Sequence, residues 1–318
     1  MNQAFVLGAG LGTRLRPLTD QLPKPLVPVF HRPLITYAFD HLRQAGIKEF
    51  IVNTHHLPTR YEEAFPTRTY EDLPVTFRHE PVLLETAGGI ANIADLLKDQ
   101  SFLVYNGDIL TDLPLAPLLQ RHEAEGNIVT LVLRSTGPGR HIEIDETSGR
   151  LTDIRNLLGT GGSGTHQFTG IYAVHPEFLK HLSPGKIESV IPIFLALIKA
   201  GAPIGGVVVD EGGWWDLGDR RQYMEAHWAL LDADNAFPLH DSAKRHHWER
   251  VSPEAMIAPD AILTGDNVIS AGAQVGAGAS LESCILWPGA SVAAGARLKN
   301  CIVRSGRVAE GEATDQDF

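Results

Sequence analysis

The sequence predicts an α/β protein with a mostly parallel sheet, followed by a short left-handed β-helix of hexapeptide repeats. Short apolar strands alternate with helical segments along the first two thirds of the chain, glycine-rich turns follow strand ends, and aliphatic residues recur every six positions near the C-terminus. A chain of 318 residues is long enough for more than one domain. We therefore predict an α/β domain over 1–235, a polar, histidine-rich linker over 236–254 and a β-helix over 255–318.

The first predicted strand, residues 3–7, is a short apolar run that leads into the glycines of residues 8–12. A helix is predicted from Pro33 to Gly46, because Pro33 suits a first helical turn and Gly46 suits a C-terminal cap. Further strands are predicted at 50–52, 103–105 and 128–133. Ligands of such sheets bind beyond the carboxyl ends of the strands, so the loops after residues 7, 52 and 105 are expected to carry the chemistry.

The C-terminal repeat has a period that fits neither an α-helix nor a simple strand. Aliphatic residues keep a six-residue spacing with one slip, at Ile257, Leu263, Ile269, Val275, Leu281, Leu286, Val292 and Leu298. A triangular β-helix with one inward aliphatic side chain per face has this period, with about 18 residues per coil and roughly three coils in 255–312. Cys284 and Cys301 hold similar repeat positions, and we expect them to be small buried residues on neighbouring coils without a disulfide bond.

Composition excludes several classes of protein. The 27 Lys and Arg residues against 38 Asp and Glu residues give a net charge of -11, which is unfavourable for a general nucleic-acid binder. No apolar run is long enough to span a membrane, and residues 1–8 do not resemble a signal peptide. We expect a cytoplasmic protein that binds neither nucleic acid nor membrane, and any anionic ligand must be held by a local basic site.

The strongest motif runs from Leu7 to Thr19 as LGAGLGTRLRPLT and is followed by Pro23-Lys24-Pro25-Leu26. A glycine-rich turn exposes backbone N–H groups to a phosphate chain, and Arg14 and Lys24 supply positive charge. The motif departs from the dinucleotide fingerprint, whose third glycine comes one residue later and whose second strand ends in an acid. It also lacks the Gly-Lys-Ser/Thr of a Walker loop.

This segment resembles the signature of the sugar-nucleotide pyrophosphorylases, the nucleotidyltransferases that make NDP-sugars. The resemblance implies a Rossmann-like catalytic domain over residues 1–235, a nucleoside triphosphate and a sugar 1-phosphate as substrates, and Mg²⁺ as cofactor. The run from Glu85 to Ile90, together with Asn53 to His56, is most similar to the N-acetylmuramate 1-phosphate uridylyltransferase and the mannose or heptose 1-phosphate guanylyltransferase branches. UTP or GTP is therefore the expected nucleotide.

The resemblance also implies roles for individual residues. The expected catalytic residues are Arg14, Lys24, Asp108 and Asp216, and the two aspartates are the expected Mg²⁺ ligands. The expected nucleotide-binding residues are Leu7, Gly8, Ala9, Gly10, Leu11, Gly12, Thr13, Glu80, Glu85, Thr86 and Gly88. The expected sugar-binding residues are Asn106, Gly170, Glu188 and Trp215.

The chemistry of the reaction accounts for these residue types without the resemblance. A sugar 1-phosphate and a nucleoside triphosphate are both polyanions, so positioning and charge neutralisation suffice without a covalent intermediate. Two separated aspartates are adequate for Mg²⁺, which takes a few carboxylates together with phosphate oxygens.

Structural roles remain open for single residues. Asp108 also suits a helix N-cap, Asp216 a turn, Glu188 a solvated first helical turn, and Trp214 and Trp215 a core. The pairs His55-His56 and His246-His247 have no partner at metal-ligand spacing, so we expect solvated histidines there. Many relatives carry a phosphate-contacting lysine in a Glu-Lys-Pro segment; the corresponding region here has Arg155, and whether it substitutes is open.

Three functions therefore stand side by side. An NDP-sugar pyrophosphorylase is favoured by the motif. A cytidylyltransferase for a phosphocholine-like acceptor would need an aromatic cage, which Trp214 and Trp215 leave open. A non-catalytic regulatory subunit would bind NDP-sugar and assemble through its β-helix, although such a subunit has no need of all four expected catalytic residues. In each case we interpret the β-helix as an oligomerisation or regulatory module, and we expect a homo-oligomer.

Overall fold

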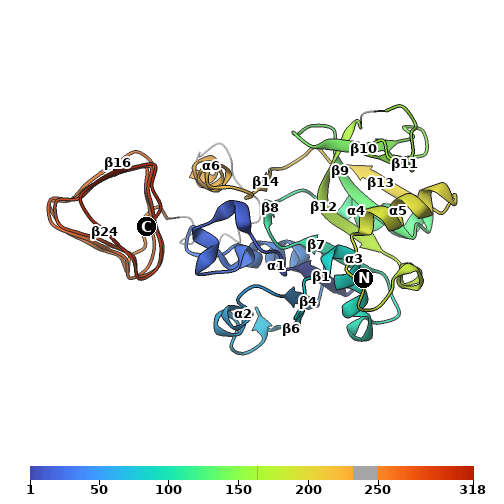
Figure 1. Cartoon of the computed structure of the whole chain (residues 1–318), viewed down its shortest axis with the longest axis horizontal. Helices are drawn as coiled ribbons and strands as arrows, with labels where there is room; N and C mark the ends of the chain where they lie inside the picture. The colour runs from blue at the N-terminus through green and yellow to red at the C-terminus, as the bar shows by residue number, and fades with distance from the viewer. Residues whose placement is uncertain (163, 232–248) are drawn as a thin grey trace. The chain divides into compact units, whose positions relative to one another are not determined.

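The computed structural model of the chain describes residues 1–162, 164–231 and 249–318 (Figure 1). These residues form two compact units. We call Met1–Leu11 with Ile35–Asp216 the sheet unit, and Gly12–Leu34 with Leu217–Phe318 the β-helix unit. The predicted linker lies largely outside the described residues, and the domain boundaries proposed from the sequence stay a prediction.

The sheet unit is built on a mixed sheet whose centre is parallel. The strand order is β11-β10-β12-β7-β1-β4-β6-β5, with β9 beside β12 and β13 beside β9. The parallel centre consists of β7 (Phe102–Asn106), β1 (Gln3–Leu7), β4 (Glu49–Thr54) and β6 (Leu73–His79). The other strands are β5 (Thr69–Tyr70), β9 (Val129–Arg134), β10 (Arg140–Ile144), β11 (Leu151–Ile154), β12 (His166–Val174) and β13 (Ile204–Val208). The α/β fold class, and strands in all four predicted places, are confirmed.

Helices flank this sheet at the positions expected of crossover connections. They are α1 (Ile35–Gln44), α2 (Thr59–Ala64), α3 (Glu85–Asn92), α4 (Ala116–Glu125) and α5 (Val190–Lys199), with 3₁₀ turns at Ala94–Leu96 and Pro176–His181. Gly46 adopts a left-handed φ of 91° just after α1, as predicted. The predicted start at Pro33 is wrong, because Arg32–Pro33 is the second strand, β3, of a hairpin with β2 (Pro28–Val29) and the helix begins at Ile35.

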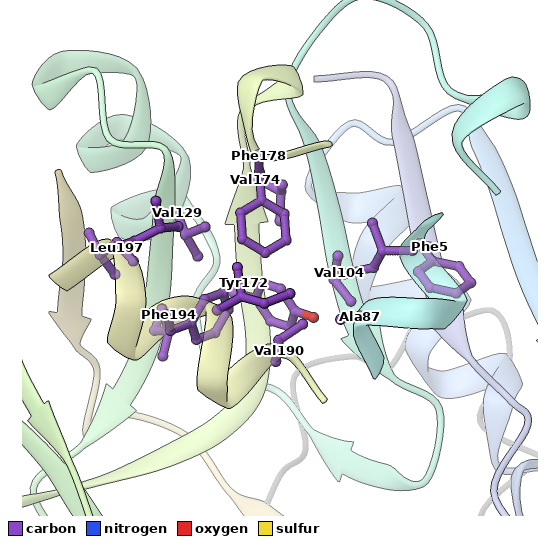
Figure 2. Packing of buried hydrophobic residues seen from close by; sticks show 14 of the residues in the cluster. Phe5, Ala87, Val104, Val129, Tyr172, Val174, Phe178, Val190, Phe194 and Leu197 are labelled. Atoms are coloured by element: carbon purple, nitrogen blue, oxygen red, sulfur yellow. The ribbon is translucent and has the colours of Figure 1, made fainter. Parts of the chain in front are cut away.

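The core of the sheet unit fills the space between the sheet and two of its helices. Phe5 of β1 and Val104 of β7 are fully buried, as is Phe194 of α5 (Figure 2). Tyr172 of β12 meets Phe194 edge to face, with ring centroids 5.9 Å apart. Burying such large side chains supplies most of the stabilisation of a domain of this size, and it fixes the strands whose ends carry the polar residues described below.

The β-helix unit contains three stacks of short parallel strands at its C-terminal end. The first stack is β15 (Met256–Ile257), β18 (Gln274–Val275), β21 (Ser291–Val292) and β24 (Val308–Ala309); the second is β16 (Ile262–Thr264), β19 (Ser280–Glu282), β22 (Arg297–Lys299) and β25 (Glu312–Thr314); the third is β17 (Val268–Ile269), β20 (Ile285–Leu286) and β23 (Ile302–Val303). Met256 pairs with Gln274 and Gln274 pairs with Ser291, so a coil takes 18 or 17 residues. The predicted period is confirmed.

The repeat residues of the β-helix point inward. Six of the eight predicted aliphatic positions, from Ile269 to Leu298, are at most 3% exposed, and Ile257 and Leu263 pack against the same core. Cys284 and Cys301 are buried and unbridged on neighbouring coils, as predicted. Aliphatic side chains in phase on stacked coils bury one continuous core, which is why this segment is ordered although its other residues are mostly small.

Three buried histidines make stability depend on pH. Burial lowers the pKa of His41, of His122 and of His227 to about 4. An unfolded chain takes up these protons from about pH 6.5 downward, so we expect the free energy of unfolding to fall as the pH decreases from about 6.5 to about 4. A fully buried histidine such as His41 contributes up to about 3 kcal/mol to this loss. Urea denaturation across this pH range measures the slope.

The matched variants for this test are His41→Gln and His79→Gln, since His79 is exposed. We expect His41→Gln to flatten the pH dependence and His79→Gln to leave it unchanged. A wild-type stability that stays constant from pH 6.5 to pH 4.5 would contradict the assignment of neutral buried histidines.

Among the described residues, the helices are too short or too polar to cross a bilayer.

Candidate functional site

Three parallel strands bring their carboxyl ends together at one edge of the sheet unit. Leu7 at the end of β1 lies in register with Asn53 of β4 on one side and with Asn106 of β7 on the other. The loops that follow these strands are the three in which the sequence places the chemistry. The parallel register alone therefore gathers the glycine turn, the Asn53 loop and the Asn106–Asp108 turn at one edge.

The start of the glycine turn is fixed by hydrogen bonds within the sheet unit. The Gly8 amide donates to Asn53 Oδ1 (2.8 Å), and the Gly8 carbonyl accepts from the Tyr61 hydroxyl (2.8 Å). A Cβ atom at Gly8 would lie 2.6 Å from the Asn53 carbonyl oxygen, so close packing requires a glycine here. Burial and, to a lesser extent, the negative charge of Asp108 raise the pKa of Tyr61, which keeps its hydroxyl a neutral donor.

Gly10 differs from Gly8. It is exposed, its φ lies outside the left-handed region, and no heavy atom of the described residues lies within 4 Å of the position of an added Cβ. Neither packing nor backbone conformation requires a glycine at this position. Open space above an exposed backbone is what close approach of a ligand needs.

Glu80, an expected nucleotide-binding residue, is fully buried beneath the turn. Its Oε1 accepts from Asn53 Nδ2 (2.8 Å), and its Oε2 accepts from the Leu84 amide (3.0 Å). Because Asn53 in turn accepts from the Gly8 amide, Glu80 orients the amide that holds the glycine turn. The sequence does not predict the roles of Asn53 and Tyr61; its one signal is that the second strand ends in Asn where a dinucleotide-binding fold has an acid.

Asp108 and Asp216 are brought together by a two-stranded ladder. β8 (Ile109–Thr111) follows Asp108 directly, and β14 (Trp214–Asp216) pairs with it in antiparallel register (Figure 1). Asp216 lies opposite Ile109, the residue next to Asp108. Both aspartates are partly exposed. Asp108 occupies a turn between strands and does not cap a helix, so the alternative N-cap interpretation is wrong.

The turn that carries Asp108 is held against β1. The Gly107 amide donates to the Leu7 carbonyl (3.0 Å), and a Cβ at Gly107 would lie 2.6 Å from that oxygen. On the other side, the Gly213 amide donates to Asp112 Oδ1 (2.6 Å) and the Thr111 hydroxyl donates to the Gly213 carbonyl (2.6 Å). These contacts lock the ladder on both sides of the aspartate pair.

Two of the expected sugar-binding residues also meet at this edge. Gly170 on β12 has a φ of 85°, and a Cβ there would lie 2.6 Å from the side-chain Nδ2 of Asn106. Trp214 donates from Nε1 to the Thr169 carbonyl (2.9 Å), and the Trp215 ring covers Gly213. Both indoles are partly exposed, so neither is a core residue. This edge therefore carries Asn106 at the end of β7, Gly170 on β12, and the aspartate pair with Trp215 at the β8–β14 ladder.

The segment from Glu85 to Gly89 forms the beginning of helix α3. The amides of Ala87 and Gly88 donate to the Glu188 carbonyl (2.8 and 3.2 Å), and the Thr86 hydroxyl accepts from the Val190 amide (2.9 Å). A Cβ at Gly88 would lie 2.2 Å from the Lys186 carbonyl oxygen. Gly88 therefore permits the Glu188 segment to pack on α3.

The charged side chains expected near the base and the sugar differ in their exposure to solvent. Glu85 is exposed, and Glu188 is 21% exposed and paired with Lys186 at 2.5 Å. Arg155 is exposed on the loop after β11 and has a φ of 56°.

The second half of the signature belongs to the β-helix unit. Arg14 lies in a short 3₁₀ helix, Thr13–Leu15, is exposed, and approaches Gly218 so closely that a Cβ there would meet its guanidinium at 2.9 Å. Lys24 begins another 3₁₀ turn, Lys24–Leu26, and is 6% exposed. Gly12 has a φ of 62°, and its carbonyl accepts from the Thr19 hydroxyl (2.9 Å). The unit thus orders both cations of the motif on 3₁₀ turns.

The charges suit a divalent cation bound together with phosphate. The part of the chain that the structure describes holds no group of three or more His, Cys, Asp or Glu side chains suited to a metal. The neighbouring pair Asp108 and Asp216 supplies two carboxylates, which is the number Mg²⁺ uses when substrate phosphates provide further oxygens.

His55 is partly buried, with its Nδ1 2.7 Å from the Glu80 carbonyl oxygen. His246 and His247 lie outside the described residues.

Comparisons with known proteins point to one family. A family model described as nucleotidyl transferase matches residues 3–233. The mannose-1-phosphate guanylyltransferase of Mycobacterium tuberculosis is 33% identical over 224 residues, which cover 70% of this chain and 62% of that protein. The N-acetylmuramate alpha-1-phosphate uridylyltransferase of Neisseria meningitidis is 31% identical over 226 residues, which cover 70% of this chain and 96% of that protein.

Solved structures share the fold of the same region. The UDP-glucose pyrophosphorylase from Acinetobacter baumanii matches with a TM-score of 0.60 and 19% identity, over 74% of this chain and 95% of that chain. HddC from Yersinia pseudotuberculosis matches with a TM-score of 0.59 and 19% identity, over 71% of this chain and 98% of that chain. At this identity the likeness concerns the fold alone.

Proposed function

From the premise that the chain belongs to the nucleotidyl transferase family, we propose that it joins a nucleoside triphosphate to a sugar 1-phosphate, giving an NDP-sugar and pyrophosphate. The single observation that carries this proposal is the ladder that sets Asp216 opposite Ile109, next to Asp108. Residues more than a hundred positions apart in the sequence are thereby neighbours, at the sheet edge where the glycine turn begins.

In the proposed reaction, a phosphate oxygen of the sugar 1-phosphate attacks the α-phosphorus of the nucleotide. The new P–O bond forms as the bond to the leaving pyrophosphate breaks, in line and without a covalent enzyme intermediate. Asp108 and Asp216 would hold Mg²⁺, which when bound offsets negative charge on the phosphates. Arg14 and Lys24 would add positive charge to the triphosphate and the departing pyrophosphate.

Other residues are proposed to place the two substrates. The exposed backbone from Gly10 to Thr13 would contact the triphosphate, and Leu7, Gly8 and Ala9 would set the position of that backbone. Glu80 would act through Asn53 and Gly8, as its buried hydrogen bonds support. Glu85, Thr86 and Gly88 would shape the base and ribose region at the start of α3. Asn106, Gly170, Glu188 and Trp215 would contact the sugar.

We propose UTP or GTP as the nucleotide. The support is the resemblance of the Glu85–Ile90 run to the uridylyltransferase and guanylyltransferase branches, together with relatives that carry both of these names. The predicted homo-oligomer also stays a proposal, which light scattering of the purified chain would test.

The test is a screen of the four nucleoside triphosphates against several sugar 1-phosphates and phosphocholine with Mg²⁺ present. The quantity measured is the rate of pyrophosphate release. We expect turnover with UTP or GTP and one or more sugar 1-phosphates, and none with phosphocholine. Turnover of CTP with phosphocholine alone would replace the proposal with a cytidylyltransferase. Nucleotide binding without turnover of any pair would instead favour a regulatory subunit.

A further inference from the structure

Within the β-helix unit, hydrogen bonds join the segment Gly12–Leu34, which contains the second half of the signature, to α6 and to the β-helix. We call this set of contacts the junction. Helix α6 (Arg220–Leu231) and the coils of the β-helix contact Gly12–Leu34 at several separate points. The Tyr223 hydroxyl of α6 donates to the Pro28 carbonyl (2.5 Å) and accepts from Trp287 Nε1 of the β-helix (3.0 Å). Tyr223 and Trp287 are at most 1% exposed.

The hydrogen-bond relay from Trp287 through Tyr223 to Pro28 requires a particular kind of side chain at its centre. An indole N–H only donates and a carbonyl only accepts, so a group between them must do both, as a phenol does. Phenylalanine at position 223 would leave the Trp287 N–H and the Pro28 carbonyl buried without their partner. The relay therefore ties the β2–β3 hairpin, which follows Lys24 in the chain, to a side chain of the β-helix.

Phe30 at the tip of this hairpin is held in a left-handed conformation, with a φ of 53°. Its amide donates to His227 Nε2 (3.0 Å), and its carbonyl accepts from the Ser270 hydroxyl of the β-helix (3.3 Å). His227 Nδ1 lies 2.8 Å from the Tyr223 carbonyl and must donate there, so the ring is neutral and its Nε2 lone pair faces Phe30. A non-glycine residue keeps such a conformation only where its surroundings fix it.

A second anchor lies on the other side of Lys24. Arg304 of the β-helix donates from Nη1 to the Pro17 carbonyl (2.9 Å) and from Nε to the Phe318 carbonyl (2.7 Å). Gln21 donates from Nε2 to the Ser305 carbonyl (3.2 Å). Pro17 is part of the signature, three residues after Arg14. Lys24 therefore lies on a stretch of chain that is hydrogen-bonded to the β-helix before it and to α6 and the β-helix after it.

We propose that Arg304 and the Trp287–Tyr223 pair are positioning residues for the cation-bearing segment Gly12–Leu34, so that the affinity for the nucleotide depends on the β-helix. The inference rests on the proposed function, in which Arg14 and Lys24 neutralise the triphosphate. By linkage, a bound nucleotide strengthens the junction by the same factor. The β-helix then contributes to nucleotide affinity, although none of its own side chains is proposed to contact the nucleotide.

The test compares Arg304→Gln with Arg297→Gln. Arg297 is an exposed β-helix arginine that faces Glu312 at 3.4 Å and is a matched control away from the junction. With UTP or GTP, whichever the wild type uses, we expect Arg304→Gln to raise the nucleotide KM about tenfold, which is within the usual range of coupling between sites. The KM for the sugar 1-phosphate should change by less than twofold, and Arg297→Gln should change neither constant. Tyr223→Phe should shift the nucleotide KM in the same direction as Arg304→Gln.

Calorimetric titration with Mg²⁺ and the same nucleotide separates positioning from loss of folding. We expect a weaker Kd for Arg304→Gln at a temperature where the variant is fully folded, with partial recovery in Arg304→Lys, which keeps a donor for Pro17. A folded Arg304→Gln with wild-type Kd and KM overturns the inference but leaves the proposed function intact. A wild type that neither binds nor turns over any nucleotide overturns the proposed function first.

Discussion

Replacement of Asp108 by asparagine is expected to lower kcat about 10³-fold or more while the protein stays folded. Asp108 lies in a turn between β7 and β8, and hydrogen bonds of the Gly107 amide and the Thr111 hydroxyl help to hold this turn and the ladder beside it. The substitution keeps size and shape but removes the negative charge that would hold Mg²⁺ beside the phosphates. Loss of about 4 kcal/mol of transition-state stabilisation corresponds to this factor. Pyrophosphate release measures the rate, and urea denaturation measures the stability.

The matched control is Asp99→Asn, since Asp99 is an exposed aspartate before β7 at the other end of that strand. Its kcat should equal that of the wild type within twofold. A folded Asp108→Asn variant that releases pyrophosphate at the wild-type rate would remove Asp108 from the machinery and, with it, the proposed site.

Replacement of Gly10 by alanine is expected to weaken nucleotide binding without lowering the stability of the fold. The position is exposed, has room for a methyl group among the described residues, and needs no left-handed φ. The free energy of unfolding should therefore stay unchanged or rise by up to about 1 kcal/mol, because alanine restricts the unfolded chain. A methyl group where the triphosphate approaches the backbone should raise the nucleotide KM about tenfold or more. Urea denaturation and steady-state kinetics measure the two quantities.

Gly139→Ala serves as the control for this substitution. Gly139 also lies outside the left-handed region, and an added Cβ there would make only an ordinary contact with His141, 3.6 Å away. It should gain similar stability with no change in KM. Equal nucleotide KM values for Gly10→Ala and the wild type would show that no ligand approaches the turn at this residue.

Much of the fold follows from local patterns. The strand at 3–7 is a short apolar run before glycines, and the β-helix repeats one aliphatic side chain every six residues, so both are visible within a few residues of sequence. The meeting of Asp108 and Asp216 was predicted only through resemblance, because no local pattern pairs β8 with β14. Once the strands are known, parallel register explains why the three loops meet.

Other features depend on neighbours that are distant in the sequence. The predicted helix start at Pro33 fails because β2 pairs with Arg32–Pro33. The carboxylate of Glu80 accepts hydrogen bonds from the Asn53 side chain, 27 positions earlier, and from the Leu84 amide. The contact of Trp287 with Tyr223 joins residues 64 positions apart. Such contacts are set by packing of the folded chain, and a single sequence carries no periodic signal for them.

The most direct measurement is the affinity of Mn²⁺ for the enzyme loaded with a non-hydrolysable UTP or GTP analogue. Electron paramagnetic resonance detects the bound Mn²⁺. If Asp108 and Asp216 share one divalent ion, Asp108→Asn and Asp216→Asn should each weaken Mn²⁺ binding at least about tenfold. The double variant should then lose less than the product of the two single effects. Wild-type Mn²⁺ affinity in a folded Asp216→Asn variant would contradict the shared site.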